Sequence, residues 1–281
     1  FVILMLIPFI GIEIKGAKRW LNFFGLRFQP IEFIKPFFVL IVAQIIGLKW
    51  TRNMNLSYFI SFILLSAIVL LLILQPDLGQ SILLICTWIS LIFVSGVNIL
   101  FLFLLFIFVI FLFLILLYLA PEKFSYIITR ITSFFDPTKA DNSQSQKAIE
   151  AIKQGGLKGE GMGEGILKES VPEAHTDYII AVISEEFGSI VSIFVISIFL
   201  FITFRIVKKI INSSNNLYKL SLCGLSSLLV FQTFIHVGVN ANLLPTTGMT
   251  LPFLSYGGSS LLSSGVLAGV ILNYTSLGVK N

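Results

Sequence analysis

The sequence predicts an all-α polytopic membrane protein, and two observations lead to this fold class. Of the 281 residues, 56% are hydrophobic and only 12% are charged, and the mean hydropathy is +0.97. A water-soluble domain carries about 25% charged residues, so this composition excludes an ordinary soluble globule. The apolar residues also form unbroken runs of about 20 residues, each long enough to cross a hydrocarbon core about 30 Å thick. Because these runs do not alternate with polar residues, helices rather than barrel strands are expected to span the membrane.

Eight apolar segments are predicted to be spanning helices, the first of them shortened. Their approximate ranges are 1–11, 30–48, 57–74, 79–97, 99–119, 177–206, 217–240 and 258–275. Together they predict a single transmembrane domain over residues 1–281. Since the chain begins at Phe1 inside an apolar run, without Met or a polar flank, an N-terminal part is expected to precede it.

The basic residues predict which side of the membrane each connecting segment occupies. Lys and Arg without acidic residues follow the second, sixth and last predicted spans, at Lys49, Arg52, Arg205, Lys208, Lys209, Lys219 and Lys280. The positive-inside rule assigns these segments to the cytoplasm. The other connecting segments then lie outside it, at 12–29, 75–78, 121–176 and 241–257.

The segment 121–176 is predicted to be a large extracytoplasmic loop, and loops of this length are usually functional. Residues 127–135 are amphipathic enough to lie at the membrane interface. A helix over 145–154 is expected to end at Gly155-Gly156. The glycines at alternate positions over 159–165 indicate a mobile or tightly turning segment, and without a following Gly-Lys-Ser/Thr they do not indicate a nucleotide site.

Charged residues beside or inside the spans are costly to bury, so they mark candidate functional positions. Arg19 lies just outside the membrane, and Glu32 and Lys35 follow at the start of the next span. Their i,i+3 spacing places both side chains on one face of a helix. These residues indicate either an interfacial anchor with a helix-stabilising ion pair or part of a polar site.

Two further acidic positions stand at the outer ends of predicted helices. Asp77, in a tight turn, is either a helix cap or a site residue. Asp177 follows His175 and Thr176 where the large loop reaches the membrane, and Glu185 lies about two turns deeper. Asp177 fits a helix cap, but it also fits a general base beside a lipid headgroup, with His175 as the competing base.

The segment 244–260 contains two prolines and three glycines and is predicted to be irregular at membrane depth. Such a backbone is tolerated where it is buried in protein or lines a wet cavity. Its hydroxyl groups, including those of Ser255 and Ser259, are candidates to bind a pyrophosphate or a sugar, and a structural re-entrant turn is the alternative. His236, in the preceding span, is expected to make a helix-packing hydrogen bond.

These segments, in this order, resemble the SEDS family of shape, elongation, division and sporulation proteins. The resemblance covers nearly the whole chain and rests on Gly16-x-x-Arg19-Trp20, Gln29-Pro30-x-Glu32-x-x-Lys35, Gln75-Pro76-Asp77-x-Gly79, His175-Thr176-Asp177 and Ser255-Tyr256-Gly257-Gly258-Ser259. Ala174 before His175, and the pair Ser259-Ser260, make the chain similar to the FtsW branch of the family rather than to the RodA branch.

The resemblance implies a SEDS fold of about ten transmembrane helices, about eight of them present in this chain. It implies a peptidoglycan glycosyltransferase of the bacterial cytoplasmic (inner) membrane, at the division septum, with its active site facing the periplasm. Lipid II and an undecaprenyl-linked glycan would be its substrates. A class B penicillin-binding protein (an FtsI-like transpeptidase) and other divisome proteins would be its partners, with no nucleic acid. The family's catalytic acid matches Asp177, its cavity-lining pair matches Glu32 and Lys35, and its basic residue matches Arg19.

The resulting hypothesis is that Asp177 takes a proton from an acceptor sugar hydroxyl, which then attacks the donor's anomeric carbon. The departing diphosphate needs positive charge, for which Arg19 and Lys35 are candidates, with a divalent cation (Mg²⁺ or Mn²⁺) as a further option. A lipid II flippase with a proton relay, or a non-catalytic divisome scaffold, is the alternative function. The predicted substrate-binding residues are Arg19, Glu32, Lys35, Asp77, His175, Thr176, Glu185, Ser255 and Ser259.

Overall fold

The structure is a computed structural model that describes residues 2–14, 17–23, 26–47, 54–101, 124–135 and 143–277, with scattered positions between 103 and 118. Most of the predicted span 99–119 therefore lies outside the described residues. Several other predictions concern residues outside them as well, namely Gly16, Lys49, Arg52 and Lys280.

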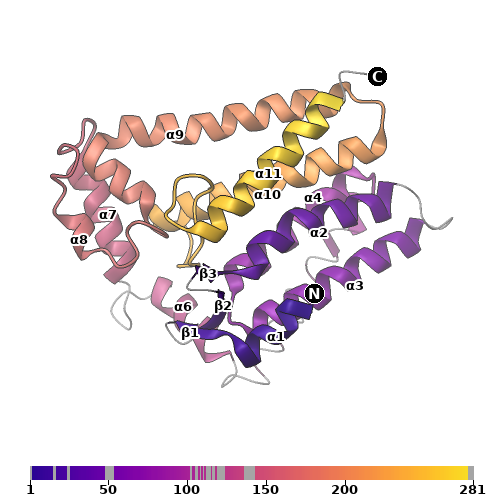
Figure 1. The fold of residues 1–281 in the computed structure, drawn as a ribbon, viewed down its shortest axis with the longest axis horizontal. Coiled ribbons are helices and arrows are strands. Elements are labelled where there is room, and N and C mark those ends of the chain that lie inside the picture. Colours follow the sequence, from indigo (N-terminus) through magenta and orange to yellow (C-terminus); the bar gives the residue numbers. More distant parts are fainter. Residues whose placement is uncertain are drawn as a thin grey trace.

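Each of the other predicted spans coincides with a helix, so the chain is a multi-pass, mostly helical membrane protein (Figure 1). Among the described residues, four helices are long and apolar enough to cross a membrane, and α4 is a shorter apolar helix. The first of the predicted spans is the short α1, and the sixth continues past residue 206 to Asn212. The helices are α1 (Val2–Ile10), α2 (Pro30–Gly47), α3 (Met54–Leu74), α4 (Leu78–Val94), α9 (Ile179–Asn212), α10 (Asn216–Asn240) and α11 (Gly258–Leu277).

Helix α10 is the centre of the bundle and packs against α2, α4, α9 and α11. Gly224 allows this close approach, because a Cβ atom there would lie 2.5 Å from a methyl group of Val39 on α2 and 2.8 Å from one of Leu91 on α4. Val39, Leu91 and Leu225 are completely buried at this junction. The outer faces of α3 and α9 instead expose large apolar side chains, as surfaces in contact with lipid do.

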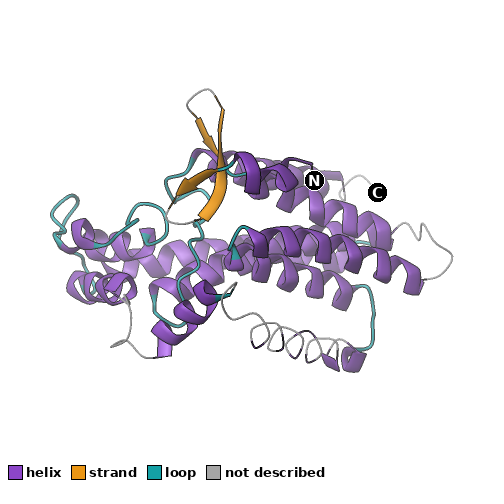
Figure 2. Ribbon diagram, turned by 90° about the horizontal axis from the view of Figure 1, so that it is seen from below, coloured by secondary structure: helices purple, strands orange, loops and turns teal. Residues whose placement is uncertain are grey.

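A small antiparallel sheet precedes α2, and the sequence analysis did not predict it. Its strands are β1 (Ile12–Ile14), β2 (Ala17–Phe23) and β3 (Leu26–Phe28), in the order β1-β2-β3. Strand β2 pairs with both neighbours, with Glu13 opposite Lys18 and Asn22 opposite Arg27. Figure 2 shows the strands standing out from the helices. The sheet matters for the site because it carries Arg19 on its central strand.

The large loop contains three helices, α6 (Ser125–Phe135), α7 (Ser143–Gly155) and α8 (Leu167–Ser170). Helix α6 covers the stretch 127–135 that was predicted to be amphipathic, and α7 confirms the predicted helix over 145–154. Helix α7 packs along the first turns of α9, so the loop lies against the end of the bundle (Figure 1).

Helix α9 is broken at Gly188, whose φ of 85° and ψ of 166° are not helical. The break frees backbone groups, and the glycine-rich part of the loop pairs with them. The amides of Glu160 and Gly161 donate to the carbonyls of Glu185 and Glu186, at 2.9 and 3.1 Å. On the far side of the break, the amide of Ser189 donates to the carbonyl of Gly156 at 2.9 Å. We call this pairing of residues 156–161 with 185–189 the loop clamp.

Candidate active site

Asp177 lies in the turn that leads into α9, at the loop end of the bundle, and its side chain is half-buried. The turn is closed by hydrogen bonds from the amides of Thr176 and Asp177 to the carbonyl of Glu173, at 3.1 and 3.0 Å. Tyr178, rather than Asp177, is the N-cap residue of α9, and it makes no side-chain capping bond. Asp177 therefore does not occupy the N-cap position of this helix.

Asn240, the last residue of α10, holds this turn in place. Its side-chain amide donates to the carbonyl of Asp177 at 2.9 Å, and its side-chain oxygen accepts from the amide of Ala181 at 3.1 Å. Asn240 is completely buried, so these bonds are shielded from water. The sequence analysis missed this residue, although a buried amide at the end of an apolar span is a signal of the same kind as the charged positions.

The irregular segment after α10 forms the opposite wall of the site and is attached to the same turn. The hydroxyl of Ser255 donates to the carbonyl of Thr176 at 2.6 Å and accepts from the amide of Leu251 at 2.7 Å. The amide of Tyr256 donates to the carbonyl of His175 at 2.9 Å. This places the two predicted segments, 172–177 and 244–260, side by side. The hydroxyl of Ser255 therefore has a structural role, because its two hydrogen bonds link these segments.

Gly248 is the point where Asp177 and Arg19 come together. Its φ is +70°, and a Cβ atom there would lie 3.6 Å from Oδ2 of Asp177 and 3.9 Å from Nη1 of Arg19. A carboxylate and a guanidinium group thus flank one exposed stretch of backbone without a side chain between them. Gly248 therefore brings the Asp177 carboxylate and the Arg19 guanidinium group to one exposed position of the irregular segment.

The Arg19 side chain is held by the turn between α3 and α4. Its Nε donates to the carbonyl of Gln75 at 3.0 Å, an Nη atom donates to the carbonyl of Pro76, and Nη1 lies 3.7 Å from Oδ1 of Asp77. Asp77 also accepts from the side chain of Gln29 at 3.2 Å and caps α4 through the amide of Gln80. Burial raises the pKa of the Asp77 carboxyl group above its ordinary value, while the Arg19 charge opposes that rise. Asp77 is therefore a cap that also positions Arg19.

Glu32 and Lys35 form a buried ion pair, with 2.8 Å between Oε2 of Glu32 and Nζ of Lys35. Only 3% of the surface of Glu32 and 1% of that of Lys35 is exposed. Polar side chains from the neighbouring helices complete it. Gln80 donates to Glu32 at 2.6 Å, and Lys35 donates to Gln232 at 3.1 Å. This burial excludes the interfacial anchor considered for the pair, since an anchor would have to reach water or headgroups.

The polar network continues from Lys35 to the wall of the site. The side-chain amide of Gln232 donates to the carbonyl of Thr250, at 3.0 Å, in the same irregular segment that contains Gly248. Gln80 and Gln232 were also missed by the sequence analysis, although each is an amide inside an apolar span. Nδ1 of His236 donates to the carbonyl of Met249 at 2.7 Å, so the packing hydrogen bond expected of His236 is made to the irregular segment.

The remaining predicted residues fall into three groups. His175 is exposed and Thr176 half-buried beside Asp177, and Ser259 is buried in the first turn of α11. Glu185 lies apart from them, because its carboxylate accepts from the amides of Leu167 and Lys168 at 2.7 and 2.8 Å. Glu185 is completely buried by these contacts, which gives it the role of anchoring the large loop instead of binding substrate.

The described residues contain no group of three or more His, Cys, Asp and Glu side chains that would hold a metal ion. The donor set around Asp177 is thus poor for a resident divalent cation, which usually takes several oxygen ligands from the protein or from its substrate.

A family model for cell cycle proteins of the FtsW, RodA and SpoVE type matches residues 1–277. The chain belongs to this family. Among curated relatives, the probable peptidoglycan glycosyltransferase FtsW of Caulobacter vibrioides is 38% identical over 272 residues, which cover 96% of this chain and 68% of that protein.

Solved structures of family members share the fold. A chain from work on the structural coordination of polymerization and crosslinking by a peptidoglycan synthase complex is similar with a TM-score of 0.76 and 26% identity, covering 100% of this chain and 79% of that one. The rod shape determining protein RodA of Thermus thermophilus has a TM-score of 0.66 and 27% identity, covering 98% of this chain and 73% of that one.

Proposed function

We propose that this chain is a peptidoglycan glycosyltransferase that polymerises lipid II into glycan strands for the septal wall. Membership of the FtsW, RodA and SpoVE family and the names of the relatives support the reaction class. The observation that carries the proposal is the placement of Asp177 and Arg19 on either side of Gly248, at the end of the helices where a lipid headgroup would lie.

Asp177 is the general base of the proposed reaction. Its carboxylate takes the proton of the 4-hydroxyl group of the acceptor sugar, and the freed oxygen attacks the anomeric carbon of the donor. The bond between that carbon and the diphosphate oxygen breaks as the new glycosidic bond forms. This single displacement converts an α linkage into a β linkage. A positioned general base typically contributes a factor of about 10²–10⁴ to the rate.

Arg19 is the proposed stabiliser of the departing undecaprenyl diphosphate. The diphosphate gains negative charge as the bond breaks, and a fixed guanidinium group in a site of low dielectric constant stabilises that charge strongly. The bonds from Arg19 to the carbonyls of Gln75 and Pro76 fix its direction before substrate binds. Lys35 is fully buried and already paired with Glu32, so its role is to hold the polar network behind the wall at Thr250.

The remaining parts of the proposal concern location and partners. The positive-inside rule places the Asp177 end on the periplasmic face of the cytoplasmic membrane. There it meets lipid-linked substrates from the outer leaflet, at the division septum. A class B penicillin-binding protein is the proposed partner, because a relative of this fold occurs in a peptidoglycan synthase complex.

One assay separates this function from a flippase and from a scaffold. The full-length protein is purified with its class B penicillin-binding partner and given labelled lipid II in detergent, and products are separated by gel electrophoresis. Long glycan strands are expected. Transfer of lipid II across sealed vesicles without strands would favour the flippase, and neither activity would favour the scaffold.

A further inference from the structure

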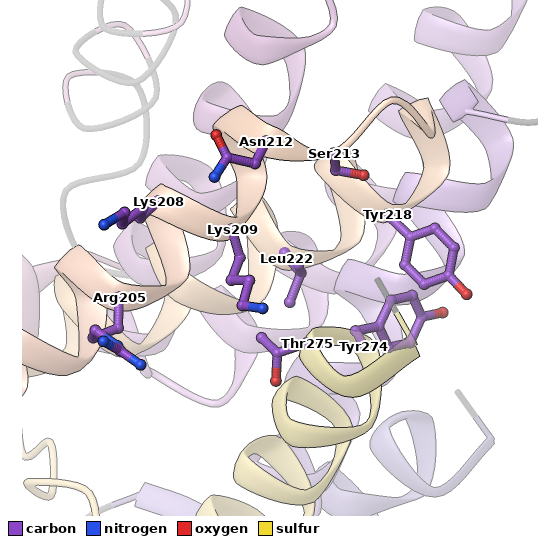
Figure 3. A pocket seen from close by; sticks show the side chains of 9 residues that line it. All are labelled: Arg205, Lys208, Lys209, Asn212, Ser213, Tyr218, Leu222, Tyr274 and Thr275. Carbon is purple, nitrogen blue, oxygen red and sulfur yellow. The ribbon is translucent and has the colours of Figure 1, made fainter. Parts of the chain in front are cut away.

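A polar cavity lies at the opposite end of the bundle from Asp177. It has a volume of about 320 Å³ and is formed by the end of α9, the following turn, the start of α10 and the end of α11 (Figure 3). Tyr218 of α10 lines it, while Asn240 of the same helix binds Asp177. With a rise of 1.5 Å per residue, these two positions are roughly 33 Å apart, about the thickness of a membrane core.

Three cations gather at this cavity without a carboxylate on their side of the membrane. Arg205 lies three and four residues before the adjacent Lys208 and Lys209, and all three line the cavity, with the side chains of the two lysines leaving α9 in different directions (Figure 3). The sequence has no Asp or Glu over residues 33–76, 78–121 and 187–281, the stretches that supply every described helix end on this side. Among the described residues, the ion pairs are elsewhere, around Arg19, Lys35 and Lys168.

The other lining residues suit the headgroup of a lipid. Asn212, Ser213 and Thr275 bring side chains that donate hydrogen bonds. The rings of Tyr218 and Tyr274 pack edge to face, 5.3 Å between their centres, and tyrosine is enriched at membrane interfaces. Leu222 is buried and supplies an apolar surface toward the membrane interior. The volume of the cavity is near the lower limit for ligand sites, and it is large enough for a lipid headgroup.

The cavity exists because α9 and α11 each pack against α10 rather than mainly against one another. Two simpler roles for the cations are to balance the dipole at the end of α9 and to set the orientation of the chain. Both roles are met by basic residues at the end of α9, whatever surrounds them. Neither calls for a cavity walled by tyrosine rings, hydroxyl groups and an amide.

We propose that this cavity binds the phosphate group of an anionic phospholipid of the inner leaflet. The phosphate lies between Arg205, Lys208 and Lys209, and the glycerol and the upper acyl chains lie toward Leu222. Basic pockets between transmembrane helices on the cytoplasmic side take anionic headgroups for this electrostatic reason. The lipid fills the space between α9 and α11. The proposal is independent of the proposed activity, which concerns the other end of the bundle.

Native mass spectrometry of the full-length protein, titrated with phosphatidylglycerol or phosphatidylcholine, tests this proposal. The wild type is expected to bind phosphatidylglycerol in preference to phosphatidylcholine. The double variant K208Q/K209Q should bind it roughly 25-fold more weakly, about fivefold for each charge. The matched control is K153Q/K158Q, which removes two exposed lysines from the large loop and should bind as the wild type does. The variant K208R/K209R keeps the charge and should retain binding.

Three results would overturn the proposal. Equal binding of both lipids would show that no anionic site exists, and equal loss in the two lysine-to-glutamine variants would show general charge attraction. Inorganic phosphate, titrated as a competitor, is expected to displace the lipid only weakly. Binding of phosphate as tight as that of phosphatidylglycerol would assign the cavity to a soluble anion and not to a lipid.

Discussion

Gly248 is the residue on which the geometry of the site depends most. Its φ of +70° lies in the left-handed region, and the position that a Cβ atom would take is in contact with both Asp177 and Arg19. Glycine suits this position because its backbone conformation is one that other residues disfavour.

We predict that Gly248→Ala lowers polymerisation on the order of 10–100-fold, since small misplacements of catalytic groups have effects of this size. The added methyl group would also introduce backbone strain of about 1–2 kcal/mol. Gly257→Ala is the control, because a Cβ atom there meets contacts of the same lengths, 3.6 and 3.9 Å, in the same segment but without a positive φ. Strand synthesis by the two purified variants provides the measurement. Equal rates for both would remove Gly248 from this role.

The buried pair of Glu32 and Lys35 gives a second prediction, made for stability. Lys35→Met leaves the Glu32 carboxylate buried without its cation, which should lower the free energy of unfolding by about 3–5 kcal/mol. Adding Glu32→Gln to that variant removes the uncompensated charge, so the double variant should recover part of the loss. Thermal unfolding in detergent would compare the three proteins. A double variant less stable than Lys35→Met would contradict the ion pair as described.

At the scale of residues, the sequence predicted those whose side chains are costly to bury. Arg19, Glu32, Lys35, Asp77 and Asp177 all take part in the site or its support. Gly248 was not predicted, because a positive φ leaves no mark among several glycines. Glu185 was predicted to bind substrate, but its carboxylate binds the backbone amides of residues 167–168. A carboxylate deep in a span fits either role, and only the folded loop brings these amides to it.

At the scale of elements, the broken helix α9 connects the large loop to the turn that carries Asp177. The loop clamp satisfies the carbonyls that the break at Gly188 leaves without helical partners. Glu185, on the short piece between the break and Asp177, also binds the backbone of the loop. The loop is thus bonded to the same piece of α9 that follows Asp177, so a displacement of the loop would be transmitted to the candidate site.

We predict that Gly188→Ala releases the loop. The φ of +85° with a ψ of 166° is a conformation that is essentially restricted to glycine, and a Cβ atom would lie 2.2 Å from the carbonyl oxygen of Leu157. The expected cost is about 3 kcal/mol or more from strain and from the displaced clamp. Limited proteolysis between residues 155 and 168 would report the release as faster cleavage.

Gly265→Ala is the control for that experiment. Gly265 lies inside α11 with no atom within 4 Å of the added carbon, so alanine should be neutral or stabilising by up to about 1 kcal/mol. Equal protection of the loop in the two variants would show that the clamp does not hold it.

The elements themselves were predictable to different degrees. Apolar runs located the helices well, and Gly155-Gly156 correctly marked the end of α7. The sheet over 12–28 was missed because its strands are only three to seven residues long, too short for alternation to stand out beside apolar runs. The break in α9 was missed because glycine inside an apolar span is common, and only contacts with the distant loop reveal it.

At the scale of the whole molecule, the bundle separates two chemically different ends. The Asp177 end carries the acidic residues and the large loop, and the other end carries cations without carboxylates over the stretches that form it. Alternation of the helices and the distribution of Lys and Arg therefore lead to the same orientation.

We predict opposite labelling of single cysteines placed at the two ends. In a protein whose two cysteines, Cys86 and Cys223, are replaced by serine, Met162→Cys should react with a membrane-impermeant maleimide in intact cells, since Met162 is 82% exposed in the large loop. Asn212→Cys, at the basic end, should react only after the cells are permeabilised. Labelling in the reverse order would invert the orientation and place Asp177 on the cytoplasmic side.

The most direct test of the central claim is the rate of lipid II polymerisation by the Asp177→Asn protein with its penicillin-binding partner. The amide keeps the size and most hydrogen bonds of the carboxylate but cannot accept the proton, so the rate should fall by about 10²–10⁴ while thermal stability stays near that of the wild type. Glu164→Gln, an exposed carboxylate of the same loop, should polymerise normally. Glycan synthesis by Asp177→Asn at the rate of the Glu164→Gln protein would contradict Asp177 as the base.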